Sequence, residues 1–307
     1  MSLQYNKLGQ RILAEGEFTF NDRTGKNCLT LIDHDLTYNV GAGEFPIDTT
    51  RESNWEGAVA ELLGYLRGLD DASLFKALGT GTWLKNAASP TWVKSKFRKL
   101  VYQLIPGNQD KEPPETYMGR PYGKQLRSWI IPDRFVPKDE VSPRQTIDQL
   151  RKVYNNLKMG IDDRGEILMM WNPGEHHLGC LRPCMYGYQF SLLNGTLHLH
   201  ATQRSCDVPL GLNYNMVQCY AFLAIMARIT GHKPGKVFHK LVNAHVYEDQ
   251  LENFKVHMAR KPDDQKPQFI LPDEMKTLED IETWVTPEHF AVTGYKPQGP
   301  IKYKFSA

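Results

Sequence analysis

Residues 203–235 have the sequence QRSCDVPLGLNYNMVQCYAFLAIMARITGHKPG, which is the stretch that decides the fold. From Tyr214 onward it is apolar on nearly every side, which is typical of a helix buried within a core. Gly231 lies just past this run and predicts the end of the helix. The stretch begins with Arg204 and Ser205, a pair that suits anion binding at the end of a strand. It therefore predicts a buried helix beside an anion-binding strand end.

The residues before this stretch predict a β-hairpin. Residues 186–205 form two alternating segments around Asn194-Gly195, the pair that favours a type I′ turn. Residues 165–171, GEILMMW, predict a further buried strand. A turn over Asn21–Gly25 followed by Leu29–Ile32 predicts a strand near the N-terminus.

Apolar spacing predicts helices elsewhere in the chain. They lie at residues 3–15, at Trp55–Leu66 with Gly68 as a stop, and at residues 143–160 with Ile147 on the apolar side. Residues 235–260 predict a strand followed by another helix. Without repeats or a low-complexity linker, these elements favour one α+β domain over residues 1–307, built on a large sheet.

Composition limits the classes of function. The 307 residues are 41% hydrophobic and carry a net charge of +2, so no global charge attracts nucleic acid or membrane. The N-terminus does not resemble a signal peptide, and no run reaches the roughly 18 apolar residues of a membrane helix. The five cysteines are irregularly spaced, and Cys180 and Cys184 lack the spacing of a zinc knuckle. We expect a cytoplasmic protein without metal or disulfide framework.

Residues 84–116 are rich in Lys, Pro and Asn and include the basic amphipathic segment WVKSKFRKL, residues 92–100. This segment has two interpretations. It could contact nucleic acid or substrate, or it could be a solvated surface helix within an insertion. We favour the surface helix, because small charge clusters are common on protein surfaces.

Cys184 is the candidate nucleophile. It lies in LRPCMYGYQF, residues 181–190, directly after Pro183 and at the mouth of a predicted strand. A free cysteine is most often a small buried hydrophobe. A nearby Arg204 would lower the thiol pKa by stabilising the thiolate and would also bind phosphate. The alternative for Arg204 is a surface ion pair.

Several motifs in order resemble the thymidylate synthase superfamily. They are NDRTG, FPIDTT, AELL, YGKQLRSW, WNPGE, RPCM, QRSCDVPLGLNYN and NAHVY. The resemblance covers almost the whole chain except the insertion at about residues 84–116. It implies an α+β fold with a large mixed β-sheet covered by helices, in a homodimer that packs sheet to sheet.

The resemblance also implies the chemistry. A thiolate adds to C6 of dUMP, and C5 then attacks the one-carbon unit of 5,10-methylenetetrahydrofolate, the co-substrate; no metal takes part. The implied catalytic residues are Cys184, Glu61, Tyr122 and Asp207. The implied nucleotide ligands are Arg23, Arg204, Ser205, Asn215, His245, Tyr247 and, across the dimer, Arg164. The implied folate contacts are Trp83, Asp207 and Gly211.

The residue types of Glu61 and Asn215 support these roles independently of the resemblance. Glu61 lies among apolar neighbours, where a carboxylate is costly without a specific task, here ordering water and assisting proton transfer. Asn215 offers a donor and an acceptor that match O4 and N3–H of uracil, whereas the cytosine-specific relatives have aspartate there. The alternative for Asn215 is a helix N-cap.

Four positions depart from the family pattern. Met185 follows the nucleophile where histidine is usual, Leu84 replaces an acidic residue, Gly64 replaces a tryptophan, and Gly165 replaces the second of two arginines. Met185, Gly64 and Leu84 are expected to surround the carbon at which an exocyclic methylene forms. Water addition there gives 5-hydroxymethyl-dUMP and tetrahydrofolate; hydride transfer gives dTMP and dihydrofolate.

The departures favour a deoxyuridylate hydroxymethylase, an enzyme found in bacteriophages that modify their DNA. The alternative is a divergent thymidylate synthase. A third alternative is an inactive nucleotide- or nucleic-acid-binding regulator, which the joint presence of Cys184, Glu61, Tyr122, Arg204 and Asn215 disfavours.

Overall fold

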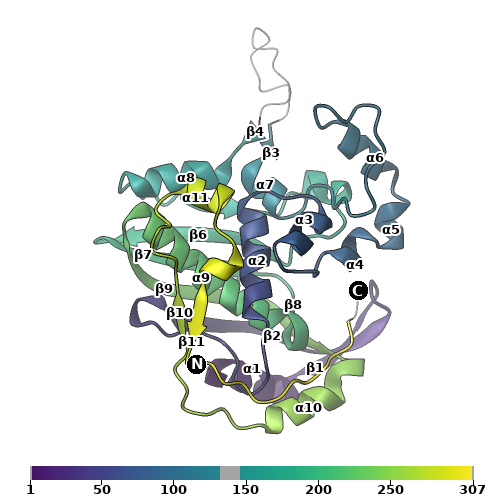
Figure 1. Ribbon diagram of the computed structural model, residues 1–307. Coiled ribbons are helices and arrows are strands. Elements are labelled where there is room, and N and C mark those ends of the chain that lie inside the picture. The colour runs from purple at the N-terminus through teal and green to yellow at the C-terminus, as the bar shows by residue number, and fades with distance from the viewer. Residues whose placement is uncertain (1, 132–145, 306–307) are drawn as a thin grey trace.

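The computed structural model describes residues 2–131 and 146–305. Its centre is a seven-stranded sheet with the order β1-β2-β9-β7-β6-β5, in which β8 lies beside β9 (Figure 1). Strand β9 runs parallel to β7 and β8, and the other neighbours are antiparallel. The strands of this sheet are β1 Glu17–Asn21, β2 Lys26–Asn39, β5 Ile167–Met169, β6 Met185–Leu193, β7 Thr196–Gln203, β8 Cys206–Asp207 and β9 Lys233–Tyr247. The expected α+β fold with a large mixed sheet is confirmed.

Two small two-stranded sheets and a set of helices complete the described fold. The small sheets pair β3 Trp129–Ile130 with β4 Thr146–Ile147 and β10 Gln268–Ile270 with β11 Ala291–Thr293. The α-helices are α1 Ser2–Glu15, α2 Trp55–Leu66, α3 Ala72–Ala77, α4 Leu84–Ala87, α5 Pro90–Val93, α6 Lys96–Gln103, α7 Gly123–Arg127, α8 Gln149–Lys158, α9 Asn213–Thr230, α10 Leu251–Ala259 and α11 Leu278–Thr283. Short 3₁₀ turns are η1 Val40–Ala42, η3 Pro173–Leu178, η5 Glu248–Gln250 and η6 Pro287–His289, and η4 Val208–Leu212 is a π-helical turn.

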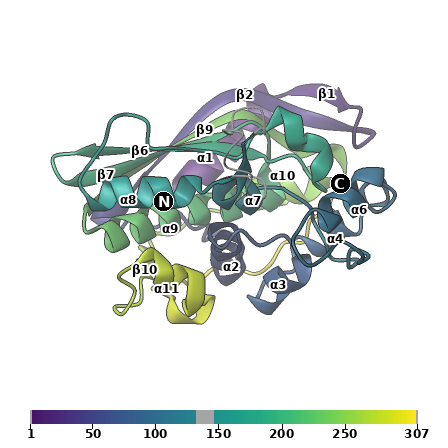
Figure 2. The ribbon, with the colours of Figure 1, turned by 90° about the horizontal axis from the view of Figure 1, so that it is seen from above.

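The helices lie on one face of the large sheet (Figure 2). Helix α9 packs against β7 and β9, α1 packs against β2, and α2 lies on α9 in a further layer. Within the described residues no helical layer covers the other face, and Ile32, Phe238 and Val242 are exposed on the strands that form it. The core therefore lies between the sheet and α9, and the cavity described below opens at one edge of this layer.

Helix α9 and the hairpin before it agree with the sequence. Every α9 residue from Met216 to Ala227 is buried, and Gly231 ends the helix with a φ of +82°. Asn194 and Gly195 have φ values of +49° and +75°, as the predicted type I′ turn requires. The two best-supported predictions of local structure are thus confirmed.

Two predicted boundaries were wrong. Ile147 lies in β4 opposite Trp129 and is 43% exposed, because Asp148 caps α8 and the helix begins only at Gln149. The first part of that predicted helix, residues 143–145, lies outside the described residues. Strand β2 extends to Asn39, well beyond the predicted Leu29–Ile32, because β9 pairs with it along most of its length.

The basic segment at residues 92–100 is a surface element with a structural arginine. Arg98 is buried and donates hydrogen bonds to the carbonyl oxygens of Pro113 and Pro114. Trp92, Val101 and Tyr117 form a small separate core beneath α6. This arrangement agrees with the surface-helix interpretation, because Arg98 is not exposed to a ligand.

Candidate active site

A cavity of about 520 Å³ lies between α2, α9 and the ends of β7 and β9. Its walls bring together residues from distant parts of the chain. Those predicted from the sequence that line it are Arg23, Glu61, Trp83, Tyr122, Cys184, Met185, Ser205, Asp207, Gly211, Asn215, His245 and Tyr247.

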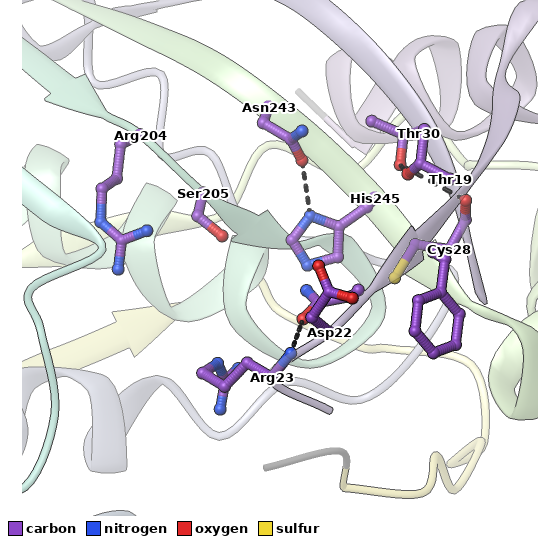
Figure 3. A pocket seen from close by; sticks show the side chains of 11 residues that line it. Thr19, Asp22, Arg23, Cys28, Thr30, Arg204, Ser205, Asn243 and His245 are labelled. Atoms are coloured by element: carbon purple, nitrogen blue, oxygen red, sulfur yellow. Dashed lines mark hydrogen bonds between the residues drawn. The ribbon is translucent and has the colours of Figure 1, made fainter. Parts of the chain in front are cut away.

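A polar pocket of about 420 Å³ is shown in Figure 3. It shares Arg23, Ser205 and His245 with the cavity. Arg204 lines the polar pocket from the end of β7. Its Nε donates to the carbonyl oxygen of Pro183 at 2.9 Å, and its guanidinium lies 4.9 Å from the ring centroid of Trp171. Among the described residues no carboxylate forms an ion pair with Arg204, so the predicted alternative of a surface ion pair is not what holds it. Two arginines and a hydroxyl around one hollow suit a phosphate group.

Cys184 lies directly before β6, and its side chain is partly exposed to the cavity. Its backbone N–H donates to the hydroxyl of Tyr122 at 2.6 Å. Burial raises the pKa of the Cys184 thiol, while Arg204 and the hydrogen bond with Tyr122 lower it. Tyr122 has a φ of +35°, a strained conformation of a kind that concentrates at functional sites.

The electrostatic effect of Arg204 on Cys184 predicts a change in thiol reactivity. In Arg204→Ala the thiol pKa rises, so less thiolate is present at pH 8. We expect alkylation of Cys184 by iodoacetamide to slow by about three- to tenfold, since a shift of one pKa unit changes the thiolate fraction tenfold. The rate is followed by mass spectrometry of the peptide that contains Cys184. Arg182→Ala is the control, because Arg182 lines neither the cavity nor the polar pocket. Equal rates in all three proteins would contradict the effect.

Glu61 is held at both carboxylate oxygens. The Thr82 hydroxyl donates to Oε1 at 2.6 Å, and the Gln218 side-chain amide donates to Oε2 at 2.7 Å. Burial raises the pKa of Glu61, and these two hydrogen bonds oppose that rise. Neither Thr82 nor Gln218 could be predicted from the sequence, since only the packing of α2 against α9 and the loop before α4 brings them to the carboxylate.

Asn215 lies inside the first turn of α9 and faces the cavity. The helix N-cap is Leu212, so the alternative of an N-cap role for Asn215 was wrong. The side chain of Asn215 is hydrogen-bonded to Gln203 and Gln218. Its amide is therefore placed by side chains and is presented to the cavity.

The far wall of the cavity holds further predicted residues. Burial lowers the pKa of His245 to about 4, so the imidazole is neutral at pH 7, and its Nδ1 lies 2.8 Å from Oδ1 of Asn243. Burial raises the pKa of Asp207 to about 6, against hydrogen bonds from the Gln250 side chain and the Leu210 N–H. A neutral imidazole and a carboxylate with a raised pKa can both exchange hydrogen bonds with a neutral ligand.

Comparison of the sequence with known proteins shows which family the chain belongs to. Residues 3–307 match the family model described as thymidylate synthase. The chain belongs to the thymidylate synthase family. It is 54% identical over 305 residues to a thymidylate synthase of Vibrio parahaemolyticus, with 99% of each chain covered. It is 52% identical over 305 residues to that of Haemophilus influenzae and 51% identical over 304 residues to that of Shewanella loihica, again with 99% of each chain covered.

These thymidylate synthase relatives change one expectation from the sequence. The departures at Met185, Gly64 and Leu84 favoured a phage hydroxymethylase, but the relatives named here are bacterial thymidylate synthases. The comparisons therefore support the alternative, a thymidylate synthase, and give no support to the hydroxymethylase subtype or to a phage source.

The structure also explains why Gly64 is a poor indicator of water entry in this thymidylate synthase family member. Neither Gly64 nor Leu84 lines the cavity, whereas Met185 does. The ring of Phe75 is fully buried and fills the space beside Gly64, where an added Cβ would lie 2.2 Å from Phe75 Cε1. An aromatic ring therefore fills the space beside Gly64, and the expected place of Gly64 around the reacting carbon stays a prediction. Leu84 is half-buried against the main core.

This packing predicts the effect of Gly64→Ala on stability. The methyl group would overlap the Phe75 ring, which is enclosed by Tyr65 and Trp83. We expect the free energy of unfolding to fall by about 1–3 kcal/mol, the usual cost of overpacking. Urea denaturation followed by circular dichroism measures this change. Gly64→Ala combined with Phe75→Leu should recover part of the loss, and no recovery would argue against the overlap.

Arg164 is exposed, has a φ of +68° and lines neither pocket of its own chain. Its predicted role across a dimer therefore stays a prediction for this member of the thymidylate synthase family. Among residues 2–131 and 146–305, no three His, Cys, Asp or Glu side chains gather as a metal site would require. No helix within that part of the chain is long and apolar enough to cross a membrane.

Proposed function

We propose that this chain acts as a thymidylate synthase. It transfers the one-carbon unit of methylenetetrahydrofolate to C5 of dUMP and yields dTMP and dihydrofolate. One observation carries the proposal: Cys184, Glu61 and Asn215 line a single cavity, and that cavity adjoins a pocket with two arginines. A nucleotide with its phosphate at the arginines would place its base near the thiol, the carboxylate and the amide.

The polar pocket would bind the phosphate. Arg23, Arg204 and Ser205 offer charge-assisted hydrogen bonds to its oxygens. His245 and Tyr247 would contact the sugar hydroxyl from β9. We further propose a homodimer through the uncovered sheet face, in which Arg164 of a second copy adds to the phosphate site. The exposed apolar side chains on that face support this arrangement.

The residues next to the uracil base would each have a different role in the reaction. The Cys184 thiolate adds to C6 of uracil, and the electron pair moves through C5 to O4, where Asn215 donates a hydrogen bond. Glu61, held by Thr82 and Gln218, would order a water near O4 and move protons there. Tyr122, which already accepts a hydrogen bond from Cys184, would help to remove the C5 proton through water.

The remaining cavity wall fits a folate. Trp83, Leu181, Leu210 and Tyr214 form an apolar surface beside the Asp207 carboxylate. A flat ring with N–H donors matches this combination, because the ring packs on the apolar surface and its N–H groups reach the carboxylate. The folate supplies the one-carbon unit and then the hydride. The chain's part is to orient it, with Gly211 as a contact, and to exclude water.

The product tests the proposal. Purified protein is incubated with dUMP and methylenetetrahydrofolate. The mass of the nucleotide product is measured by mass spectrometry, and formation of dihydrofolate is followed by absorbance. We expect a methyl product together with dihydrofolate. A product that carries an added hydroxymethyl group, with tetrahydrofolate, would identify the hydroxymethylase instead. Absence of tritium release from dUMP labelled at C5 would refute both enzymes.

Met185 predicts how water is kept from the intermediate. It is buried, lines the cavity and follows the nucleophile. In Met185→Asn an amide would retain water near the methylene carbon. We expect the rate of dTMP formation to fall about tenfold, which corresponds to about 1.4 kcal/mol, and some hydroxymethyl product to appear. Mass spectrometry of the product mixture measures both, with Met185→Leu as the apolar control. The same product ratio in both variants would remove Met185 from this role.

A further inference from the structure

Asn215 lies between two buried glutamines. The side-chain amide of Gln203 donates to Oδ1 of Asn215 at 2.9 Å, and Nδ2 of Asn215 donates to Oε1 of Gln218 at 3.2 Å. Gln203 is 1% exposed and Gln218 is 3% exposed, so water does not readily substitute for these bonds. Both ends of the Asn215 amide are therefore engaged by another amide.

The orientation of Gln218 is fixed by groups that can only accept hydrogen bonds. Its Nε2 faces Oε2 of Glu61 at 2.7 Å and the carbonyl oxygen of Ala58 at 3.4 Å. A carboxylate and a backbone carbonyl cannot donate, so the NH₂ end of Gln218 must face them. Its own carbonyl oxygen is then directed to Asn215.

Gln203 is fixed in the same manner on the other side. Its Nε2 also donates to the backbone carbonyl oxygen of Ser205 at 3.0 Å. Its Oε1 lies 2.9 Å from Nε2 of His239, whose Nδ1 lies 2.9 Å from the hydroxyl of Tyr38. Burial lowers the pKa of His239 to about 3, so the neutral ring donates from Nε2 and accepts from Tyr38 at Nδ1. The NH₂ end of Gln203 is thus directed to Asn215.

We propose that Gln218, together with Gln203, is a specificity-determining residue that holds the Asn215 amide in the orientation that pairs with uracil. The proposal deepens the proposed function and rests on it. In this orientation one lone pair of Oδ1 and one N–H of Nδ2 remain for the base. They match N3–H and O4 of uracil.

Gln203 and Gln218, which we call the clamp, also disfavour binding of cytosine, although neither needs to contact the base. Cytosine presents an acceptor at N3 and an amino donor at C4, which match an Asn215 amide rotated by half a turn. That rotation would place NH₂ against NH₂ of Gln203 and carbonyl against carbonyl of Gln218. Both hydrogen bonds would be lost inside a buried site, where unsatisfied polar groups are costly. Discrimination between the bases is therefore set partly by Gln218.

Gln218→Met tests the clamp, because methionine has a similar shape and makes none of these hydrogen bonds. The dissociation constants of dUMP and dCMP are measured by isothermal titration calorimetry on the full chain, without folate. We expect dUMP to bind more weakly and dCMP to bind more tightly than to the unaltered protein. The ratio of the two constants should change by about tenfold or more, as the loss of one buried hydrogen bond implies. Met226→Leu, a buried change elsewhere on α9 and outside the cavity, should leave the ratio unchanged.

The gain in dCMP affinity separates the clamp from a merely structural role. General loosening of the site would weaken both nucleotides together, and that result would overturn the proposal. If Gln218→Met does not fold, as judged by circular dichroism, His239→Leu tests the opposite side of the clamp from outside the cavity. It should change the ratio in the same direction, and an unchanged ratio there also counts against the clamp. Failure of the unaltered protein to bind either nucleotide would instead refute the proposed function.

Discussion

Replacing Cys184 with alanine is expected to abolish formation of dTMP. In the proposed mechanism the Cys184 thiolate bonds to C6, and none of the other described cysteines lines the cavity. Loss of a covalent nucleophile typically lowers kcat by about 10⁴- to 10⁶-fold. Binding of dUMP should remain within about tenfold, since the proposed phosphate and base contacts come from Arg23, Arg204 and Asn215.

Turnover and binding are measured separately for this variant. Dihydrofolate absorbance gives kcat, and calorimetry with dUMP gives the dissociation constant. Cys180→Ala is the matched control, because Cys180 lies four residues upstream, is partly buried and does not line the cavity. Residual turnover above about 1% of that of the unaltered protein, after correction for contaminating active enzyme, would rule out the covalent route through Cys184.

Glu61→Gln is expected to have the second largest effect. The amide has nearly the same shape but cannot accept a proton, and its NH₂ would face a donor from either Thr82 or Gln218. Loss of a proton-transfer group lowers kcat by about 10²- to 10⁴-fold. Steady-state kinetics with dUMP should show this loss mainly in kcat.

The control for Glu61 comes from the same helix. Glu56 is exposed in the first turn of α2 and does not line the cavity, so Glu56→Gln should retain normal turnover. If Glu61→Gln retained more than about a tenth of the normal kcat, Glu61 would not be a proton-transfer group.

Local sequence patterns predicted those helices and hairpins whose secondary structure is determined by residues close together in the chain. The apolar run before Gly231 identified α9, and Asn194-Gly195 identified the hairpin, because each signal is complete within a short stretch. Ile147 was assigned to the wrong element because Asp148 offered a cap that the spacing of apolar residues does not reveal. The sequence motifs pointed to the candidate site residues, and twelve of these candidates line one cavity.

The partners of those candidates could not be predicted from local pattern. Gln218 meets Glu61 across 157 positions of sequence, and Thr82 meets it across 21. Gly64 departs from the family pattern, and Phe75 fills the space beside it from the next helix. These contacts depend on how α2, α3 and α9 pack together, which no spacing within one segment encodes.

The pairing of β2 with β9 bears on how the protein is made in the cell. Cys28 lies opposite Tyr247 and Asn39 lies opposite Lys236. Strand β2 therefore cannot pair with β9 until β9, which is translated much later, has been made. Arg23 and His245, which both line the polar pocket, are brought together by the same pairing. A nascent chain that has emerged only as far as residue 232 therefore lacks the strand at the centre of the sheet and one wall of the polar pocket.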